Sequence, residues 1–297
     1  MRKDNPNLAN NCRFSAGGKD IEPQWGRRKG DGEVREQALE LDAGKIDAEL
    51  TSSFLNEVVN RVERLADPSN ADALEAASAL IVDALIAGGI VQAFGTGHSE
   101  AFAMEIAGRA GGLIPTNRIA LRDVVLYGQR NASVLGGAAL ERDASVVDEL
   151  LDGLSLHPAD VFIIASNSGV NGSIVEMALR AKERGHALIA VTSLEHTHAV
   201  DPKHPSGKRL SDVADVVIDN LAPFGDSTLT VGDGIGVGAV SSLTAAFIAQ
   251  VLTITVAQRL VLAGEVPPVY ISANIPGGDE HNGALEDRYR GRLRRLA

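Results

Sequence analysis

The chain has 297 residues, 44% of them hydrophobic, which is enough to bury a sizeable core in one large domain or two small ones. Its formal charge of −11 argues against a nucleic-acid partner, because such proteins need a basic face to neutralise phosphates. The single cysteine, Cys12, excludes an intramolecular disulfide and a cysteine zinc site, and it fits a reducing cytoplasm.

The first 45 residues differ from the rest of the chain. They are rich in Asn, Gly, Lys, Arg and Asp and show neither helical nor strand periodicity, as is typical of a poorly ordered extension. We therefore predict an extension over residues 1–45 and a single domain over residues 46–297.

Two helices come first in the predicted domain, because apolar residues recur at helical spacing from residue 55 and again over residues 74–85. An apolar strand over residues 91–94 then enters the first turn, residues 95–99, and a helix over residues 101–109 follows. Free amides at a helix N-terminus, the helix dipole and nearby hydroxyls can hold a phosphate without any lysine. The sequence therefore predicts an anion site at the first turn.

Two more strands end in turns of the same kind. Residues 161–165 lead into the second turn, residues 166–173, before a helix over residues 174–184, and residues 187–191 lead into the third turn, residues 192–193. In a parallel sheet the carboxyl ends of such strands converge on one edge. The residues expected to bind the phosphate there are Gly95, Thr96, Gly97, Ser99, Ser166, Asn167, Ser168, Gly169, Asn171, Thr192 and Ser193.

The remaining elements continue an alternation of strands and helices. They are a short strand at residues 113–115, a helix at 143–154, a long loop at 195–209, a strand at 213–219, a glycine-rich connection at 223–238 and the longest helix at 239–263. This alternation indicates a parallel α/β sheet with helices on both faces. We expect the longest helix to be buried rather than to span a membrane, because Ser, Thr and Gln side chains lower its hydropathy, and its apolar length favours a homo-oligomer.

The three turns resemble, in order and spacing, those of SIS (sugar isomerase) domains, which bind phosphosugars. The run HPSGKRL at residues 204–210 and the run ADVVIDN at residues 214–220 resemble a bacterial subgroup of phosphoheptose isomerase-like proteins, and the resemblance covers residues 48–297. It implies a three-layer αβα sandwich with a five-stranded parallel sheet (the SIS fold). It also implies a homodimer or homotetramer with active sites near the subunit contacts.

The chain departs from phosphoheptose isomerases at one position. The catalytic glutamate of those enzymes falls at Arg109 here, and the nearest carboxylate belongs to Glu105, one turn earlier. Isomerisation through an enediol needs one carboxylate within reach of two adjacent carbons, so Glu105 is the predicted base, whereas Glu100 is expected to face solvent. The alternative for Glu105 is a salt bridge with Arg109, four residues later on the same face of the helix.

Histidines are candidates for opening the sugar ring. His98 lies inside the first turn, where a neutral imidazole can bond a phosphate oxygen or a sugar hydroxyl; the alternative is a solvent-facing side chain. His196, His198 and His204 lie in the long loop without fixed helical ligand spacing, so we expect a mobile surface loop and no metal.

The segment near the C-terminus is a second candidate for proton transfer. Glu280 and His281 follow a flexible Gly-Gly pair, and in SIS isomerases such a late segment often reaches the active site of a neighbouring subunit. The alternative is that Asp279 or Asn282 caps a helix over residues 283–296 and the rest is exposed.

The leading hypothesis is a cytoplasmic aldose–ketose isomerase of a phosphorylated sugar, which needs no cofactor and has neither a membrane nor a nucleic-acid partner. Two alternatives stay open. The first is a lyase that cleaves the lactyl ether of N-acetylmuramate 6-phosphate with the same phosphate site, and the second is a non-catalytic sugar-phosphate sensor. Release of lactate would identify the lyase, and thermal stabilisation by ligand without turnover would identify the sensor.

Overall fold

The structure is a computed structural model that describes residues 47–294, and it contains a sheet of five parallel strands. In chain order the strands are β1 (Val91–Gly95), β2 (Thr116–Ile119), β3 (Val161–Ala165), β4 (Ala187–Thr192) and β5 (Val216–Asp219). Across the sheet they follow the order β2-β1-β3-β4-β5. The predicted five-stranded parallel sheet is confirmed, while the predicted extension over residues 1–45 lies outside the described residues.

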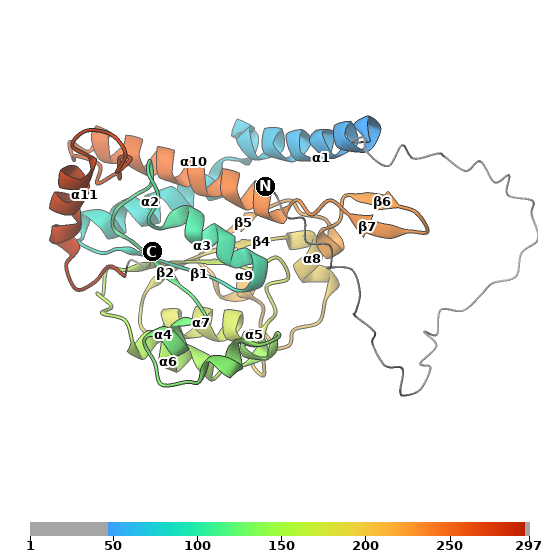
Figure 1. Ribbon diagram of the computed structural model, residues 1–297, viewed down its shortest axis with the longest axis horizontal. Coiled ribbons are helices and arrows are strands. Elements are labelled where there is room, and N and C mark those ends of the chain that lie inside the picture. The colour runs from blue at the N-terminus through green and yellow to red at the C-terminus, as the bar shows by residue number, and fades with distance from the viewer. Residues whose placement is uncertain (1–46, 295–297) are drawn as a thin grey trace, which may run out of the picture. The chain divides into compact units, whose positions relative to one another are not determined.

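Helices cover both faces of this sheet (Figure 1). The face drawn uppermost carries α1 (Ala48–Ala66), α2 (Asp72–Ile86), α3 (Glu100–Ile106) and α10 (Ser241–Leu262). The opposite face carries α4 (Asp123–Leu126), α5 (Ala139–Arg142), α6 (Val146–Asp152), α7 (Gly172–Glu183) and α9 (Leu210–Val213). The arrangement is the predicted three-layer αβα sandwich.

Side chains of the central strands alternate between two cores, as the pleat of a strand requires. Val91 and Ala93 of β1 pack in the core with α2, α3 and α10, whereas Phe94 packs in the core with α6 and α7. Ile163 and Phe162 of β3 divide between the two cores in the same way. Because both faces of each strand are buried, the strands read as nearly continuous apolar runs in the sequence.

The strands at the two edges of the sheet begin three residues later than the sequence predicts. Residues 113–115 are not a strand, since Pro115 has no N–H to donate and contributes only its carbonyl, which accepts from Val91 at 2.9 Å. Leu113 instead forms an antiparallel bridge with Val269. At the other edge, the first of the residues predicted as a strand belongs to helix α9, and β5 starts at Val216.

The segment predicted as a mobile loop over residues 195–209 is ordered by its own hydrogen bonds. Helix α8 (Leu194–Ala199) begins after Ser193, whose hydroxyl accepts from the His196 N–H at 3.0 Å. Arg209 then closes the loop by donating to the carbonyls of Thr197 and Val200 at 2.9 and 3.0 Å. His204 is buried, so the expectation of a solvated surface loop is wrong at this residue.

The glycine-rich connection and the C-terminal segment also differ from the prediction. A hairpin of β6 (Leu229–Val231) and β7 (Ile235–Val237) lies within residues 223–238. Helix α11 spans Gly278–Glu286 and not residues 283–296, and Asn282 lies inside it, exchanging two hydrogen bonds with the backbone of Ile271. Single 3₁₀ turns occupy Pro68–Asn70, Gly97–Ser99, Ala132–Leu135, Phe224–Asp226 and Asp287–Tyr289.

Helix α10 is the one helix of the described residues that is long and apolar enough to cross a membrane by length and composition. It packs against α2 and α3, and residues such as Ile248, Leu252 and Val256 belong to the core on that face of the sheet. The prediction of a buried helix therefore holds for this side of α10.

Candidate functional site

The carboxyl ends of the strands surround a small pocket at the point where the strand order reverses. The chain leaves β1 towards α3 on one face and leaves β3 towards α7 on the other, which opens a crevice between the two strand ends. The pocket is lined by His98, Ser99, Phe102, Ala165, Ser166, Asn167, Val191, Asn220, Ser241, Ser242 and Ala245.

The first turn supplies His98 and Ser99 to the pocket, and it depends on two glycines. A side chain at Gly95 would place its Cβ 2.3 Å from the Ser99 carbonyl oxygen, so only glycine allows the chain to fold back this closely. Gly97 has a φ of +56°, in the left-handed region that favours glycine. Both glycines therefore have a steric reason to stand in this turn, and their binding of a phosphate stays a prediction.

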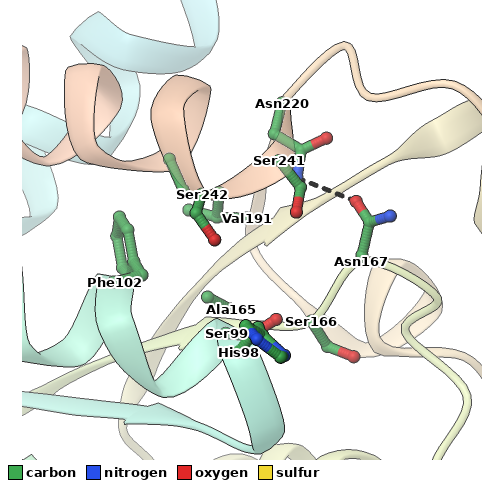
Figure 2. A pocket seen from close by; sticks show the side chains of 11 residues that line it. His98, Ser99, Phe102, Ala165, Ser166, Asn167, Val191, Asn220, Ser241 and Ser242 are labelled. Atoms are coloured by element: carbon green, nitrogen blue, oxygen red, sulfur yellow. Dashed lines mark hydrogen bonds between the residues drawn. The ribbon is translucent and has the colours of Figure 1, made fainter. Parts of the chain in front are cut away.

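The second turn supplies Ser166 and Asn167, and hydrogen bonds orient both. The Ser166 hydroxyl accepts from the Gly169 N–H at 3.1 Å. Asn220 donates from Nδ2 to Asn167 Oδ1 at 3.1 Å, drawn as the dashed line in Figure 2, and itself accepts from the Ala222 N–H at 3.0 Å. These bonds fix which end of each amide carries the N–H groups.

Three polar lining residues were missed by sequence reasoning: Asn220, Ser241 and Ser242. The two serines begin α10, and Figure 2 shows them across the pocket from His98 and Ser99 at the start of α3. The available signal was a pair of hydroxyls at the start of the longest predicted helix, directly after the glycine-rich connection.

The hydroxyls of the third turn are directed away from the pocket. Thr192 donates from Oγ1 to the Ser166 carbonyl at 2.7 Å, and Ser193 donates from Oγ to the Ala222 carbonyl at 2.6 Å. Both side chains are fully buried and neither lines the pocket. They stabilise the loops that carry Ser166 and Asn220, whereas the sequence predicted that they bind the phosphate.

The two carboxylates of α3 form ion pairs. Glu105 pairs with Arg109, as the alternative interpretation held, and also accepts from Gln250 Nε2 of α10 at 3.0 Å. Glu100 pairs with Arg122 and lies 3.8 Å from a nitrogen of Arg118. Neither glutamate lines the pocket, so the structure does not bring Glu105 together with His98.

A further carboxylate, that of Glu141, lies beside the first and second turns. Its Oε1 accepts from Asn171 Nδ2 at 2.7 Å, and a Cβ built at Gly97 would lie 3.5 Å from its Oε2. Asn171 thus contacts Glu141 instead of lining the pocket, and Ser168 does not line it either. Sequence reasoning missed Glu141 because it belongs to α5, a four-residue helix too short to produce a hydrophobic period.

The late segment lies away from the pocket within this chain. Figure 1 shows α11 at the end of the sheet opposite to α8, and its Leu285 packs with Ile114, which precedes β2. His281 is exposed and bonds through Nε2 to the Val269 carbonyl at 3.0 Å, and Glu280 is exposed. A role of Glu280 and His281 in the site of a neighbouring subunit therefore stays a prediction.

His196 and His204, in the segment predicted as a mobile loop, each bond to other groups of the protein. His204 bonds through Nε2 to Glu176 Oε2 at 2.9 Å, and its Nδ1 accepts from Ser206. His196 Nδ1 accepts from the Gly225 N–H at 3.4 Å, next to Asn167. Within residues 47–294, no group of three or more His, Cys, Asp or Glu side chains is arranged to hold a metal ion.

Comparison with known proteins identifies the family. The SIS domain model matches residues 53–193. The UPF0309 protein of Caldanaerobacter subterraneus subsp. tengcongensis is 34% identical over 82% of this chain and 98% of its own length, and that of Brucella canis is 38% identical over 82% and 98%. This chain belongs to the UPF0309 family. It contains a SIS domain, the phosphosugar-binding domain that its turns resemble.

Among solved structures, a phosphoheptose isomerase from Francisella tularensis covers 72% of this UPF0309 chain and 100% of its own, with 16% identity and a TM-score of 0.48. A phosphoheptose isomerase from Neisseria gonorrhoeae covers 70% and 98%, with 18% identity and a TM-score of 0.46. Similarity at this level carries no conclusion about activity.

Proposed function

We propose that this protein binds a phosphorylated sugar in the pocket and interconverts its aldose and ketose forms through an enediol. The observation that carries the proposal is the lining of the pocket, which combines four serine hydroxyls and two oriented amides with a single imidazole, that of His98. The amides and hydroxyls suit the phosphate, and the imidazole has nitrogens that can bond the sugar oxygens.

The pocket attracts an anion without a formal positive charge of its own. None of its lining residues is Lys, Arg, Asp or Glu, so the phosphate meets hydroxyls and amide N–H groups. These dipoles act at hydrogen-bond range, where they outweigh the weak repulsion from a chain with a net charge of −11.

The reaction needs only proton movement. A base removes the proton from the carbon beside the carbonyl, the C–H electron pair forms the enediol double bond, and the carbonyl oxygen takes up a proton. His98, which lies in the pocket, is the proposed partner of the sugar oxygens in this step and in ring opening. Return of a proton to the former carbonyl carbon, with loss of the proton from the hydroxyl on the other carbon, completes the interconversion, and no cofactor enters the balance.

Nuclear magnetic resonance in heavy water tests the proposal. The protein is incubated with hexose, amino-sugar, pentose and heptulose phosphates, and proton and phosphorus spectra are followed. Deuterium at the carbon beside the carbonyl together with a new ketose or aldose phosphate is the expected result. Binding of a sugar phosphate without deuterium exchange would overturn the isomerase proposal. Release of lactate from N-acetylmuramate 6-phosphate would instead identify the lyase that cleaves the lactyl ether.

A second candidate function is a sugar-phosphate sensor that binds without turnover. The observation that favours it is the ion pairing of Glu105 with Arg109, which leaves the predicted base outside the pocket. For a sensor, a sugar phosphate raises the melting temperature and is recovered unchanged after prolonged incubation.

A further inference from the structure

We propose that Glu141 is the base that moves the proton between the two sugar carbons, an assignment that rests on the proposed isomerase function. Three glutamates lie on or beside the first turn and the helix that follows it: Glu100, Glu105 and Glu141. The first two pair with arginines, whereas within residues 47–294 Glu141 has no ion-pair partner. An arginine partner stabilises the ionised carboxylate and blocks its oxygens, so Glu141 is the one free to act as a base.

The backbone around Glu141 holds its carboxylate in a fixed position. Leu140 is buried in the core with α6 and α7, and the Glu141 carbonyl accepts from the Ser173 hydroxyl at 2.7 Å. A Cβ at Gly172 would lie 2.2 Å from the Arg142 carbonyl oxygen, so α5 docks on the start of α7 at a distance that only glycine permits. The short helix is therefore anchored on both sides of Glu141.

The two oxygens of the carboxylate have different surroundings. Oε1 accepts from Asn171 Nδ2 at 2.7 Å, which orients the group, while Oε2 has no hydrogen-bond partner in the described part of the chain and faces Gly97. The side chain is only partly buried, so a ligand can reach it. A base needs this combination of one oxygen held and one oxygen open.

The position relative to the pocket suits a phosphosugar. The residues after Gly97, His98 and Ser99, line the pocket, so a sugar whose phosphate lies there can extend across Gly97, where no side chain intervenes, towards Glu141. Glu141 Oε2 takes the proton from the carbon beside the carbonyl, and the carbonyl oxygen is protonated from the His98 side. Glu141 then returns its proton to the former carbonyl carbon while the other oxygen gives up its proton.

Glu141→Gln tests the assignment, because glutamine keeps an oxygen that accepts from Asn171 but cannot take up a proton. We expect turnover and deuterium incorporation to fall at least about a hundredfold, with affinity for the same sugar phosphate within about threefold of the wild type. Glu183→Gln, at the far end of α7, is the matched control and is expected to leave both unchanged. Glu141→Asp, which keeps the charge, is expected to retain at least about ten times the activity of Glu141→Gln.

Separate results overturn the assignment and the proposed function. If the wild type exchanges deuterium and Glu141→Gln stays within about threefold of its rate, Glu141 is not the base while the isomerase stands. A loss in Glu105→Gln larger than that in Glu141→Gln would return the role to Glu105. If the wild type incorporates deuterium into none of the sugar phosphates, the proposed isomerase function and the assignment of Glu141 both fail. Thermal unfolding of each variant separates a lost base from a lost fold.

Discussion

At the scale of single residues, Asn167 is a pocket side chain whose orientation is fixed by a hydrogen bond. Asn220 donates to its Oδ1, so its Nδ2 N–H groups point away from Asn220, and Nδ2 lies 3.5 Å from His196 Nδ1. Asn167→Asp replaces these donors with a charged oxygen of nearly the same shape. Affinity for a sugar phosphate, measured by calorimetric titration, is expected to fall at least about tenfold because like charges meet at short range. Asn131→Asp, on the exposed surface, is the control, and an affinity of Asn167→Asp within about twofold of the wild type would contradict the assignment.

Gly95 illustrates a residue that is fixed by sterics rather than by chemistry. The Cβ of Gly95→Ala would lie 2.3 Å from the Ser99 carbonyl oxygen, so either β1 or the first turn must move. We expect the free energy of unfolding to fall by more than about 2 kcal/mol, measured by denaturant titration. Gly283→Ala, where the added Cβ meets nothing within 4 Å, is expected to be neutral or slightly stabilising. Equal stabilities for the two variants would show that the turn yields freely.

At the scale of elements, the N-terminus of α10 is held by one carboxylate. Asp226 accepts from the N–H groups of Val240 and Ser241 at 3.1 and 2.9 Å and from the Ser241 hydroxyl at 2.6 Å. Asp226→Ala is expected to lower the free energy of unfolding by about 1–2 kcal/mol, as the loss of a helix cap does, and to weaken ligand binding because Ser241 loses its orientation. Asp226→Asn, which retains an acceptor, is expected to lose less in both thermal unfolding and binding. If Asp226→Asn lowers the free energy of unfolding as much as Asp226→Ala does, the charge of Asp226 and not its capping role is the main effect.

The sequence predicts contiguous segments better than it predicts a site built from separate segments. The first and second turns were predictable because strand, turn and helix follow one another directly in the chain. Asn220, Ser241 and Glu141 lie outside these strand–turn–helix units, and a single sequence does not rank them above other asparagines, serines and glutamates. Thr192 and Ser193 share the local pattern of the first turn, but their hydroxyls are taken by carbonyls of neighbouring loops. Such competition between partners is visible only once the loops are packed.

At the scale of the whole molecule, a buried histidine links stability to pH. Burial lowers the pKa of His186 below 6.5, and its hydrogen bond with the Asp160 carbonyl at 3.0 Å opposes the shift. The unfolded chain therefore binds more protons than the folded one, and the stability that is present above pH 6.5 is lost as the pH falls. Denaturant titrations at neutral and mildly acidic pH should show this loss in the wild type and a smaller one in His186→Gln. His198→Gln, at an exposed position, is the control and should lose as much stability as the wild type. If His186→Gln also loses as much stability as the wild type, His186 is not the source of the pH dependence.

The exposed apolar side of α10 predicts that copies of this chain assemble into an oligomer. Leu243, Ile254 and Val261 recur at helical spacing and remain 45%, 65% and 59% exposed, so the helix that packs in the core also presents a second apolar side. We expect the wild type to sediment as a homodimer or homotetramer and Ile254→Lys to sediment as a smaller species. Leu55→Lys on α1, which is 59% exposed, is the control expected to keep the wild-type state.

The same variant tests whether a partner completes the site. If Glu280 and His281 of a neighbouring subunit reach the pocket, Ile254→Lys should lose turnover together with assembly, because in one chain α11 lies at the opposite end of the sheet. If the site is complete within one chain, the smaller species should keep both its ligand affinity and its activity, since the pocket-lining residues and Glu141 all belong to that chain. A wild type that sediments as a monomer would exclude the first outcome and leave α10 with an apolar side exposed to water.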